Sequence, residues 1–407
     1  MGERVHSDHQ MPSDHHTIVD EAEVDRRVIE PDRFVADTSA FIDVRIPGSA
    51  GKASYSFIGP GVSQNAGQTV NLVEPHGFNV GAATLPNGVV NNPHMHYTAE
   101  VFICTQGRFE MRVGRHGEQT LEIGPGTVFS VPTWVFRGFT NIGDDDGWLF
   151  TVLGDDETGG ILWAPQVLSA AAETGMYLSP DYTVIDTEAG DVAEDVIAPI
   201  ADDLLKELDS YSDAELLEHV VRQDQLAWSE RSLLSSVLAG HESALAPVIG
   251  FGITEDRRHR AAITNHHGFS VEWLRLAPGA STGLHCLDQH QVLLPDEGRW
   301  EIGCNRGADE ISSKPQNGSV VSIPTGCWRN LRNFGDSDAL ALIVTNGDAP
   351  ARLQWDRELI GQARNSGWGR DASGYLAPID LLGLPSSESL AANDLAVTTT
   401  QEERNRK

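Results

Sequence analysis

The sequence predicts an all-β protein made of two tandem barrels joined by a partly helical connector. The first observation is an internal repeat, in which His76 returns as His267, 191 positions later in a chain of 407 residues. The second is that each copy contains short runs of β-branched and aromatic residues bounded by Gly, Pro or Asp, which is typical of a barrel or sandwich. The third is that helical patterns are confined to the stretch between the copies.

The repeat extends well beyond one histidine. Residues 76–80 read His-Gly-Phe-Asn-Val, and residues 267–271 read His-Gly-Phe-Ser-Val. Further matched pairs are His94 with His285 and Gly107 with Gly298 at an offset of 191, then Pro132 with Pro324, Arg137 with Arg329 and Asn141 with Asn333 at an offset of 192. A nearly constant offset over roughly 100 residues indicates a tandem duplication with one inserted residue.

The elements follow from local patterns. Strands are expected in the first copy at 101–104, 108–113 and 127–131. A helix is expected over 212–221, because Ser212 is a suitable N-cap and Glu215 follows three residues later. The expected segments are a polar N-terminal arm over 1–50, a first barrel over 51–168, a partly helical connector over 169–246, a second barrel over 247–360 and a C-terminal tail over 361–407 that frays beyond about Ser386.

Composition excludes several classes of function. Lys and Arg total 29 against 59 Asp and Glu, a formal net charge of -30, which argues against nucleic acid or an anionic membrane as a partner. The four Cys form no close CxxC pair, which indicates a reducing compartment without a disulfide framework. With no signal-peptide pattern and no apolar run of about 18 residues, a cytoplasmic location is expected.

Two spaced motifs stand in the first copy. Gly88 is followed after five residues by His94, then by His96, Glu100 and Gly107, with one, three and six residues between them. Further on, Gly126 is followed after five residues by Pro132, and Asn141 comes nine positions beyond it.

This pattern resembles the two signature motifs of the cupin superfamily, G-x5-H-x-H-x3-E-x6-G and G-x5-P-x-G-x2-H-x3-N. The first matches at every defined position. The second departs twice, because Trp134 stands where the family has Gly and Arg137 where it has the last metal-binding His. The resemblance covers both copies, roughly half of the chain. It implies two double-stranded β-helix (jelly-roll) barrels, a bicupin, and a homodimer.

The first motif also predicts a metal site on physical grounds. Residues two apart on a strand share a face, so His94 and His96 project together into the barrel, and Glu100 can join them from the next strand. Two imidazoles and one carboxylate form the facial triad that suits Fe(II) and leaves positions open; Mn, Ni, Co or Zn would also accept these ligands. The resemblance likewise makes these three residues the ligands.

Arg137 has two interpretations, since a guanidinium cannot ligate a cation. It is a candidate catalytic and substrate-binding residue that holds a carboxylate or enolate beside the metal. Alternatively it pairs with Glu100 in place of a metal, or it faces solvent. Trp134 and Phe136 are the further candidates for substrate binding, in a cavity that the surrounding aromatic residues would keep apolar.

The second copy keeps too few ligands for a metal. Leu287 stands at the second His position and Gln291 at the Glu position. We therefore expect a structural barrel with His285 as a buried, hydrogen-bonded histidine. His76 and His267 are a matched pair, and because the metal-poor copy has one too, a structural hydrogen bond is favoured over catalysis.

Two classes of function remain. The first is a mononuclear metal-dependent oxygenase, by analogy with quercetinase-like dioxygenases, that cleaves a small aromatic or enolisable substrate with O2; the same ligands could serve a lyase or isomerase. The second is a non-catalytic bicupin that binds a small molecule or has a structural role.

Overall fold

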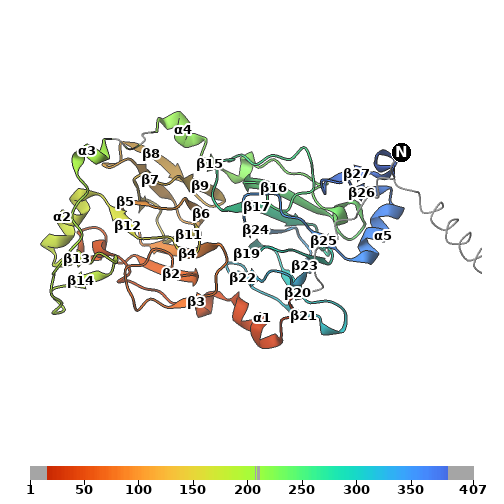
Figure 1. Ribbon diagram of the computed structural model, residues 1–407, viewed down its shortest axis with the longest axis horizontal. Coiled ribbons are helices and arrows are strands. Elements are labelled where there is room, and N and C mark those ends of the chain that lie inside the picture. The colour runs from red at the N-terminus through yellow and green to blue at the C-terminus, as the bar shows by residue number, and fades with distance from the viewer. Residues whose placement is uncertain (1–15, 207, 209–210, 384–407) are drawn as a thin grey trace, which may run out of the picture.

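The computed structural model describes residues 16–206, 208 and 211–383. It contains two jelly-roll units that lie side by side along the long axis of the molecule (Figure 1). We call the strands between residues 53 and 163 unit 1 and those between 243 and 355 unit 2. Each unit consists of two β-sheets, so the predicted all-β fold of two tandem barrels is confirmed.

In unit 1 a seven-stranded sheet faces a five-stranded sheet. The larger sheet has the order β15 (Val220–Val221), β9 (Thr127–Val131), β6 (Glu100–Gln106), β11 (Gly147–Gly154), β4 (Phe78–Leu85), β2 (Ala53–Ile58), β3 (Val70–Leu72). The smaller has the order β12 (Ile161–Trp163), β5 (Val90–His96), β10 (Arg137–Asn141), β7 (Phe109–Val113), β8 (Gln119–Ile123). Neighbouring strands are antiparallel except β2 and β3.

Unit 2 repeats this arrangement with six and five strands. The six-stranded sheet has the order β1 (Val28–Ile29), β22 (Val320–Ile323), β19 (Gln291–Glu297), β24 (Ala339–Asn346), β17 (Phe269–Leu276), β16 (Ser243–Ile249). The five-stranded sheet has the order β21 (Ile311–Ser313), β20 (Trp300–Cys304), β23 (Trp328–Asn333), β18 (His285–Cys286), β25 (Gln354–Trp355).

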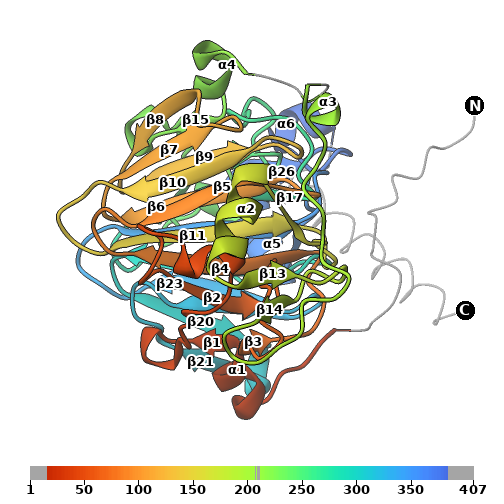
Figure 2. The ribbon, with the colours of Figure 1, turned by 90° about the vertical axis from the view of Figure 1, so that its left-hand side faces the viewer.

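Helices also lie outside the connector, so the expectation that they are confined to it is wrong. After unit 1 come α2 (Pro165–Glu173) and the hairpin β13 (Met176–Leu178) and β14 (Val184–Asp186), and α2 lies across the end of the unit that faces the viewer in Figure 2. After unit 2 come α5 (Arg357–Asn365) and the hairpin β26 (Trp368–Arg370) and β27 (Leu376–Pro378), each 192 positions later. The duplication therefore includes elements that the sequence motifs did not reveal.

The remaining elements are short. They are α1 (Glu21–Arg27), α3 (Asp202–Leu205), α4 (Asp213–Leu217), α6 (Ile379–Leu382) and the 3₁₀ turns η1 (Pro31–Arg33), η2 (Ile42–Arg45), η3 (Gln223–Gln225), η4 (Leu234–Val237) and η5 (Gly307–Asp309). The longest helices of the described chain, α2 and α5, have 9 residues, which is too few to cross a bilayer.

Each unit receives a strand from the segment that precedes the other unit. The short strand β1, before unit 1, pairs with β22 of unit 2, and β15, before unit 2, pairs with β9 of unit 1. Ser212 caps α4 with Glu215 as predicted, but the helix ends at Leu217 because Val220–Val221 continue as β15. The expected arm over 1–50 thus contributes α1 and β1 in its described part, whereas the frayed tail expected beyond Ser386 lies outside the described residues. The domain boundaries stay a prediction.

The two larger sheets pack against one another between the units. Their facing residues form one hydrophobic cluster, which includes Phe57, Phe78 and Val101 of unit 1 and Phe269 and Trp273 of unit 2. The rings of the equivalent residues Phe78 and Phe269 lie 6.0 Å apart. Burial of this apolar surface holds the units together.

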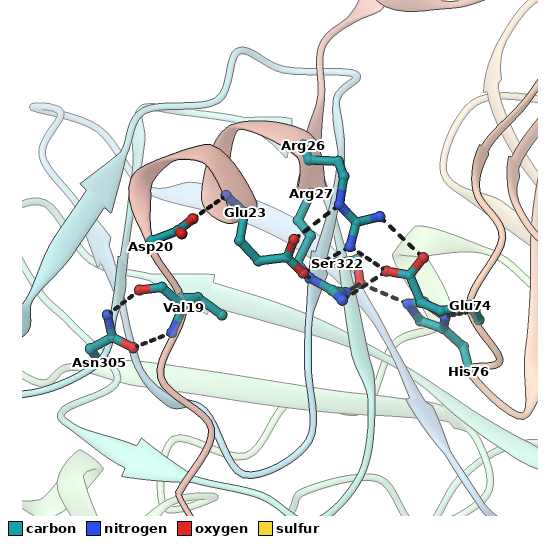
Figure 3. A network of polar contacts seen from close by, with 9 residues as sticks. All are labelled: Val19, Asp20, Glu23, Arg26, Arg27, Glu74, His76, Asn305 and Ser322. Carbon is teal, nitrogen blue, oxygen red and sulfur yellow. Dashed lines mark hydrogen bonds and ion pairs between the residues drawn. The ribbon is translucent and has the colours of Figure 1, made fainter.

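A polar network borders this contact (Figure 3). Arg26 and Arg27 of α1 both donate to Glu74 of unit 1, and Arg27 also donates to Ser322 of unit 2 at 3.0 Å. His76 Nε2 lies 2.7 Å from Ser322 Oγ. These bonds connect the N-terminal segment, unit 1 and unit 2 at one place.

Candidate metal centre

His94, His96 and Glu100 are brought together by two strands of unit 1. The first two lie on β5, two residues apart, so both point to the same face of the smaller sheet. Glu100 begins β6 in the larger sheet. The side chains therefore meet from opposite sheets, inside the unit.

The three side chains converge within bonding reach of one ion. One donor atom from each lies within 4.8 Å of the others, and the residues are 3%, 0% and 5% exposed. Ligand bonds of about 2.0–2.2 Å place neighbouring donor atoms of a facial set about 3 Å apart, so the three side chains would draw closer together around a bound ion.

The hydrogen bonds of the two histidines leave nitrogen atoms free for a metal. His94 Nδ1 lies 2.7 Å from the carbonyl oxygen of Asn92, which fixes the proton on Nδ1 and leaves Nε2 as the ligand atom. Both ring nitrogens of His96 are buried: within the described part of the chain Nδ1 has no hydrogen-bond partner, and Nε2 lies 3.3 Å from Glu100 Oε2 without hydrogen-bond geometry. Since buried polar atoms are rarely left unsatisfied, this imidazole fits a bound metal.

Burial and nearby charges also favour the protonation states in which His94, His96 and Glu100 can bind a metal. Burial lowers the pKa of His94 and of His96, assisted by the nearby Arg137, so both rings are neutral near pH 7. Burial opposes ionisation of Glu100, but His96 and the guanidinium outweigh it and hold the pKa of this carboxyl at about 2. Neutral imidazoles beside a carboxylate are what a divalent cation requires.

Arg137 contacts Glu100, as one of its two interpretations expected. Its Nε donates to Glu100 Oε2 at 3.1 Å, and its Nη1 donates to the carbonyl oxygen of Val135 at 2.9 Å. Burial lowers the pKa of Arg137 to about 10, so the side chain stays charged near pH 7. Because Glu100 Oε2 also lies 3.3 Å from His96 Nε2, the carboxylate links the guanidinium and the imidazole.

The other two substrate-binding candidates lie elsewhere. Trp134 is 44% exposed and packs edge-on against Tyr97 at 5.3 Å. Its backbone has φ 62°, the left-handed conformation that explains why the cupin motif has Gly here. Phe136 is buried in a cluster with Met95 and Trp163. Neither residue, nor Arg137, lines the cavity beside the three ligands.

A cavity of about 60 Å³ lies beside the three ligands. Its polar lining includes Ser54, Asn79, Asn91 and Thr151 beside the histidines and Glu100, and its apolar lining includes Phe41, Tyr55, Phe102, Phe139, Leu153 and Ile161. None of its lining residues in the described chain is Lys or Arg. This volume admits a few water molecules or a substrate of a few heavy atoms.

Unit 2 shows the same frame without the metal set. His285 is fully buried with Nδ1 2.8 Å from the carbonyl oxygen of Gly283, so its predicted role as a buried, hydrogen-bonded histidine is confirmed. Gln291 accepts a hydrogen bond from Arg329 at 3.4 Å, which repeats the Glu100–Arg137 contact without a carboxylate. The contact between this arginine and the residue at the Glu100 position is therefore a structural feature of both units.

The space beside the site differs between the units. Gly81 lines the cavity of unit 1, and Glu272 stands at the equivalent position of unit 2. Glu272 is buried and accepts a hydrogen bond from the backbone N–H of Ile253 at 2.9 Å. A glycine thus keeps space open in unit 1 that a carboxyl side chain fills in unit 2.

Asn91, Lys52 and Asp43 belong to no motif, and the sequence did not single them out. Asn91 lines the cavity, and the buried Lys52 contacts both Asn91 and Asp43. The available signal was the repeat itself, because the second copy holds Thr282 and Ser243 at an offset of 191 and Ser235 where η4 corresponds to η2 at an offset of 192.

The two jelly-roll units have the fold of a two-domain cupin protein, and the ligand cluster of unit 1 supports a divalent metal. Residues 82–153 match the family described as the cupin domain. The chain is similar in structure to the oxalate decarboxylase of Lactobacillus farciminis in its formate complex, with a TM-score of 0.51 and 12% identity over 86% of this chain and 92% of that one. This likeness shows the fold.

Two further solved structures are similar over most of the chain. The oxalate decarboxylase of Bacillus subtilis at pH 4.6 has a TM-score of 0.49 and 13% identity over 82% of this chain and 78% of that one. Vicilin from Corylus avellana (hazelnut) has a TM-score of 0.45 and 11% identity over 81% of this chain and 87% of that one. No curated protein sequence matches the chain.

Proposed function

We propose that this protein is a metal-dependent enzyme that acts on a small organic acid in unit 1. His94, His96 and Glu100 would hold one divalent ion. The observation that carries the proposal is the convergence of two buried histidines and one ionised carboxylate at the wall of a cavity, with one donor atom from each within 4.8 Å of the others.

Manganese(II) and iron(II) are the two ions that we propose for the site. Two imidazoles with one carboxylate suit Fe(II), and carboxylate oxygen suits Mn(II) as well. The oxalate decarboxylase of Bacillus subtilis is described as having Mn(II) centres. The ligand types of this chain are compatible with both ions.

The charges and size of the site favour a small anion as substrate. A divalent ion with Glu100 and the nearby Arg137 would carry a net positive charge in a buried place, and such a charge attracts anions strongly. The cavity of about 60 Å³ suits a molecule the size of a two- or three-carbon acid and is too small for a flavonol. We therefore propose small carboxylates in place of the small aromatic or enolisable substrates of the dioxygenase analogy.

The reaction that we favour is cleavage of a carbon–carbon bond without O2, a lyase reaction. When bound, the ion supplies a Lewis acid that polarises the substrate's oxygen atoms. Glu100 stays ionised beside it, and the Asn92 carbonyl holds His94 in the tautomer that ligates through Nε2. Phe102, Phe139 and Leu153 form an apolar wall that excludes water from the reacting acid.

The second candidate is a dioxygenase. It is favoured by the ligand set itself, since two histidines and one carboxylate leave positions open for both substrate and O2. A non-catalytic bicupin, in which the Arg137–Glu100 contact replaces the metal, is the third outcome that an experiment must separate.

The test is metal analysis followed by product analysis. The purified protein would be loaded with Mn(II) or Fe(II) and mixed with oxalate, malonate, pyruvate and acetylacetone. Release of CO2 without O2 uptake supports the lyase, and O2 uptake supports the dioxygenase. A protein that takes up no metal, while folded, overturns both enzymes.

A further inference from the structure

A buried ion pair lies directly behind the cavity wall of unit 1. Lys52 Nζ donates to Asp43 Oδ1, and the two side chains are 6% and 0% exposed. Lys52 Nζ also donates to Asn91 Oδ1 at 3.2 Å and lies 5.6 Å from the ring centre of Phe41. Both Asn91 and Phe41 line the cavity.

The pair is connected to the ligand strand as well. Asp43 Oδ2 accepts hydrogen bonds from the backbone N–H of Asn92 at 3.3 Å and from Asn92 Nδ2 at 2.9 Å. The carbonyl oxygen of Asn92 in turn accepts from His94 Nδ1. One carboxylate thus fixes the part of β5 that carries Asn91, Asn92 and His94.

Stability alone does not account for this pair. Removing two charges from water costs free energy that their attraction repays only in part, so a buried ion pair is often no better than an uncharged replacement. Unit 2 demonstrates the alternative, because Ser235 and Ser243 stand at the two equivalent positions and Thr282 at that of Asn91. At these two positions the charges are present in the unit that has the metal ligands and absent from the one that lacks them, although unit 2 has an ion pair of its own between Glu255 and Arg370.

The chemistry of lysine determines how the Asn91 amide is turned. A lysine ammonium can only donate, so the atom of Asn91 that contacts Lys52 must be the carbonyl oxygen Oδ1. The amide group Nδ2 then takes the other position. It forms no hydrogen bond with any described residue, and Asn91 borders the cavity.

We propose that Lys52 is a positioning residue that turns the Asn91 Nδ2 group into the cavity, where Asn91 donates a hydrogen bond to a carboxylate oxygen of the substrate. This inference rests on the proposed function and extends it by naming the specificity residue. Since none of the lining residues in the described chain is Lys or Arg, the amide supplies a neutral donor beside the metal.

The central experiment uses Asn91→Asp with formate as the probe. This variant keeps the size of the side chain and an oxygen that accepts from Lys52, but it replaces the donor that faces the cavity with an acceptor. Formate affinity of the Mn(II)-loaded protein, measured by calorimetry and by the Mn(II) spin-resonance spectrum, is expected to fall roughly tenfold or more. Metal content stays at one ion per chain.

A double variant tests the role of Lys52 separately. Asp43→Asn with Lys52→Met removes both charges together, so that neither is left buried alone. We expect a loss of formate affinity with metal retained, because the amide is no longer held in one orientation. The control is Glu255→Gln with Arg370→Met, which removes an ion pair, joined at 3.1 Å, between the buried Glu255 and the partly buried Arg370 of β26 and should leave formate affinity unchanged.

The outcomes separate this inference from the function beneath it. If the unaltered protein binds Mn(II) and formate but Asn91→Asp binds formate within twofold as well, the inference is wrong and the proposed function stands. If the unaltered protein takes up no metal, both the proposed function and this inference are wrong. Asn91→Ser, which removes the donor without adding a charge, must also weaken formate binding, and its failure to do so would overturn the inference even if Asn91→Asp misfolds.

Discussion

His76 Nε2 lies 2.7 Å from Ser322 Oγ, although 246 residues separate them in the chain. The same contact recurs in the other direction, because His267 Nε2 lies 2.6 Å from Ser130 Oγ. The matched histidines of the repeat therefore bind across the contact between units, which confirms the predicted structural hydrogen bond. Two equivalent residues make two equivalent bonds because the units face one another about an approximate twofold axis.

Removing these bonds should weaken the whole protein. Ser130→Ala is expected to lower the free energy of unfolding by about 1 kcal/mol, since it leaves a buried imidazole nitrogen without its partner, and Ser322→Ala by at least as much, since Arg27 also loses its acceptor. Urea denaturation measures the effect. The exposed Ser373 serves as control, because Ser373→Ala should change nothing. Unchanged unfolding in both test variants would contradict the importance of these bonds.

The same histidines should make the protein sensitive to acid. Burial lowers the pKa of His76 and of His267 below the usual 6.5. The unfolded chain then takes up protons first as pH falls, so the stabilisation is complete above pH 6.5 and is lost below it. The free energy of unfolding should differ less between pH 7.5 and pH 5.5 in the double variant His76→Gln with His267→Gln than in the unaltered protein. An equal difference in both proteins would rule out these two residues as the source.

Metal binding should depend on His94 of unit 1 but not on His285, which stands at the equivalent position of unit 2. His94→Ala is expected to reduce bound metal from one ion per chain to less than a tenth, because one of three ligands is lost. His285→Ala, at the equivalent position of unit 2, should leave metal content unchanged. Elemental analysis of the dialysed proteins provides the measurement. Equal loss in both variants would show that the effect is structural.

Arg137 and Arg329 should differ in their importance for stability. Both are fully buried, but Arg137 faces the carboxylate Glu100 whereas Arg329 faces the amide Gln291. Arg137→Met leaves a buried charge unpaired and is expected to cost about 3 kcal/mol or more, and Arg329→Met less. Thermal unfolding of the metal-free proteins distinguishes them. A larger loss in Arg329→Met would refute this account of the charge.

Glu272 should make unit 2 less stable as pH rises. Burial raises the pKa of this carboxyl to about 8, from an ordinary value of 4.5. The folded state holds the proton of Glu272 more tightly than the unfolded chain does. The contribution of this protonated carboxyl to the stability of the fold is therefore complete below pH 4.5 and declines as pH rises toward 8. Glu272→Gln, which stays neutral, is expected to have a free energy of unfolding about 4 kcal/mol above that of the unaltered protein at pH 8 and equal to it near pH 4.5. A constant difference across this range would show that Glu272 does not titrate there.

The sequence by itself determined the duplication, the strand-rich fold and the cluster of His94, His96 and Glu100. These features depend on local rules, since the alternation of side chains along a strand fixes which residues share a face. It also showed that Leu287 and Gln291 leave the second copy without a metal set. Such inferences need only the residue types and their spacing.

The tertiary structure alone decided the rest. The exchange of β1 and β15 between units, the contact of Arg137 with Glu100, and the place of Trp134 on the surface depend on packing between segments far apart in the chain. The pair Lys52–Asp43 likewise joins the approach to β2 with η2, and only folding brings it behind Asn91. Contacts of this kind have no periodic signal in the sequence, because they are set by which surfaces meet once each sheet has formed.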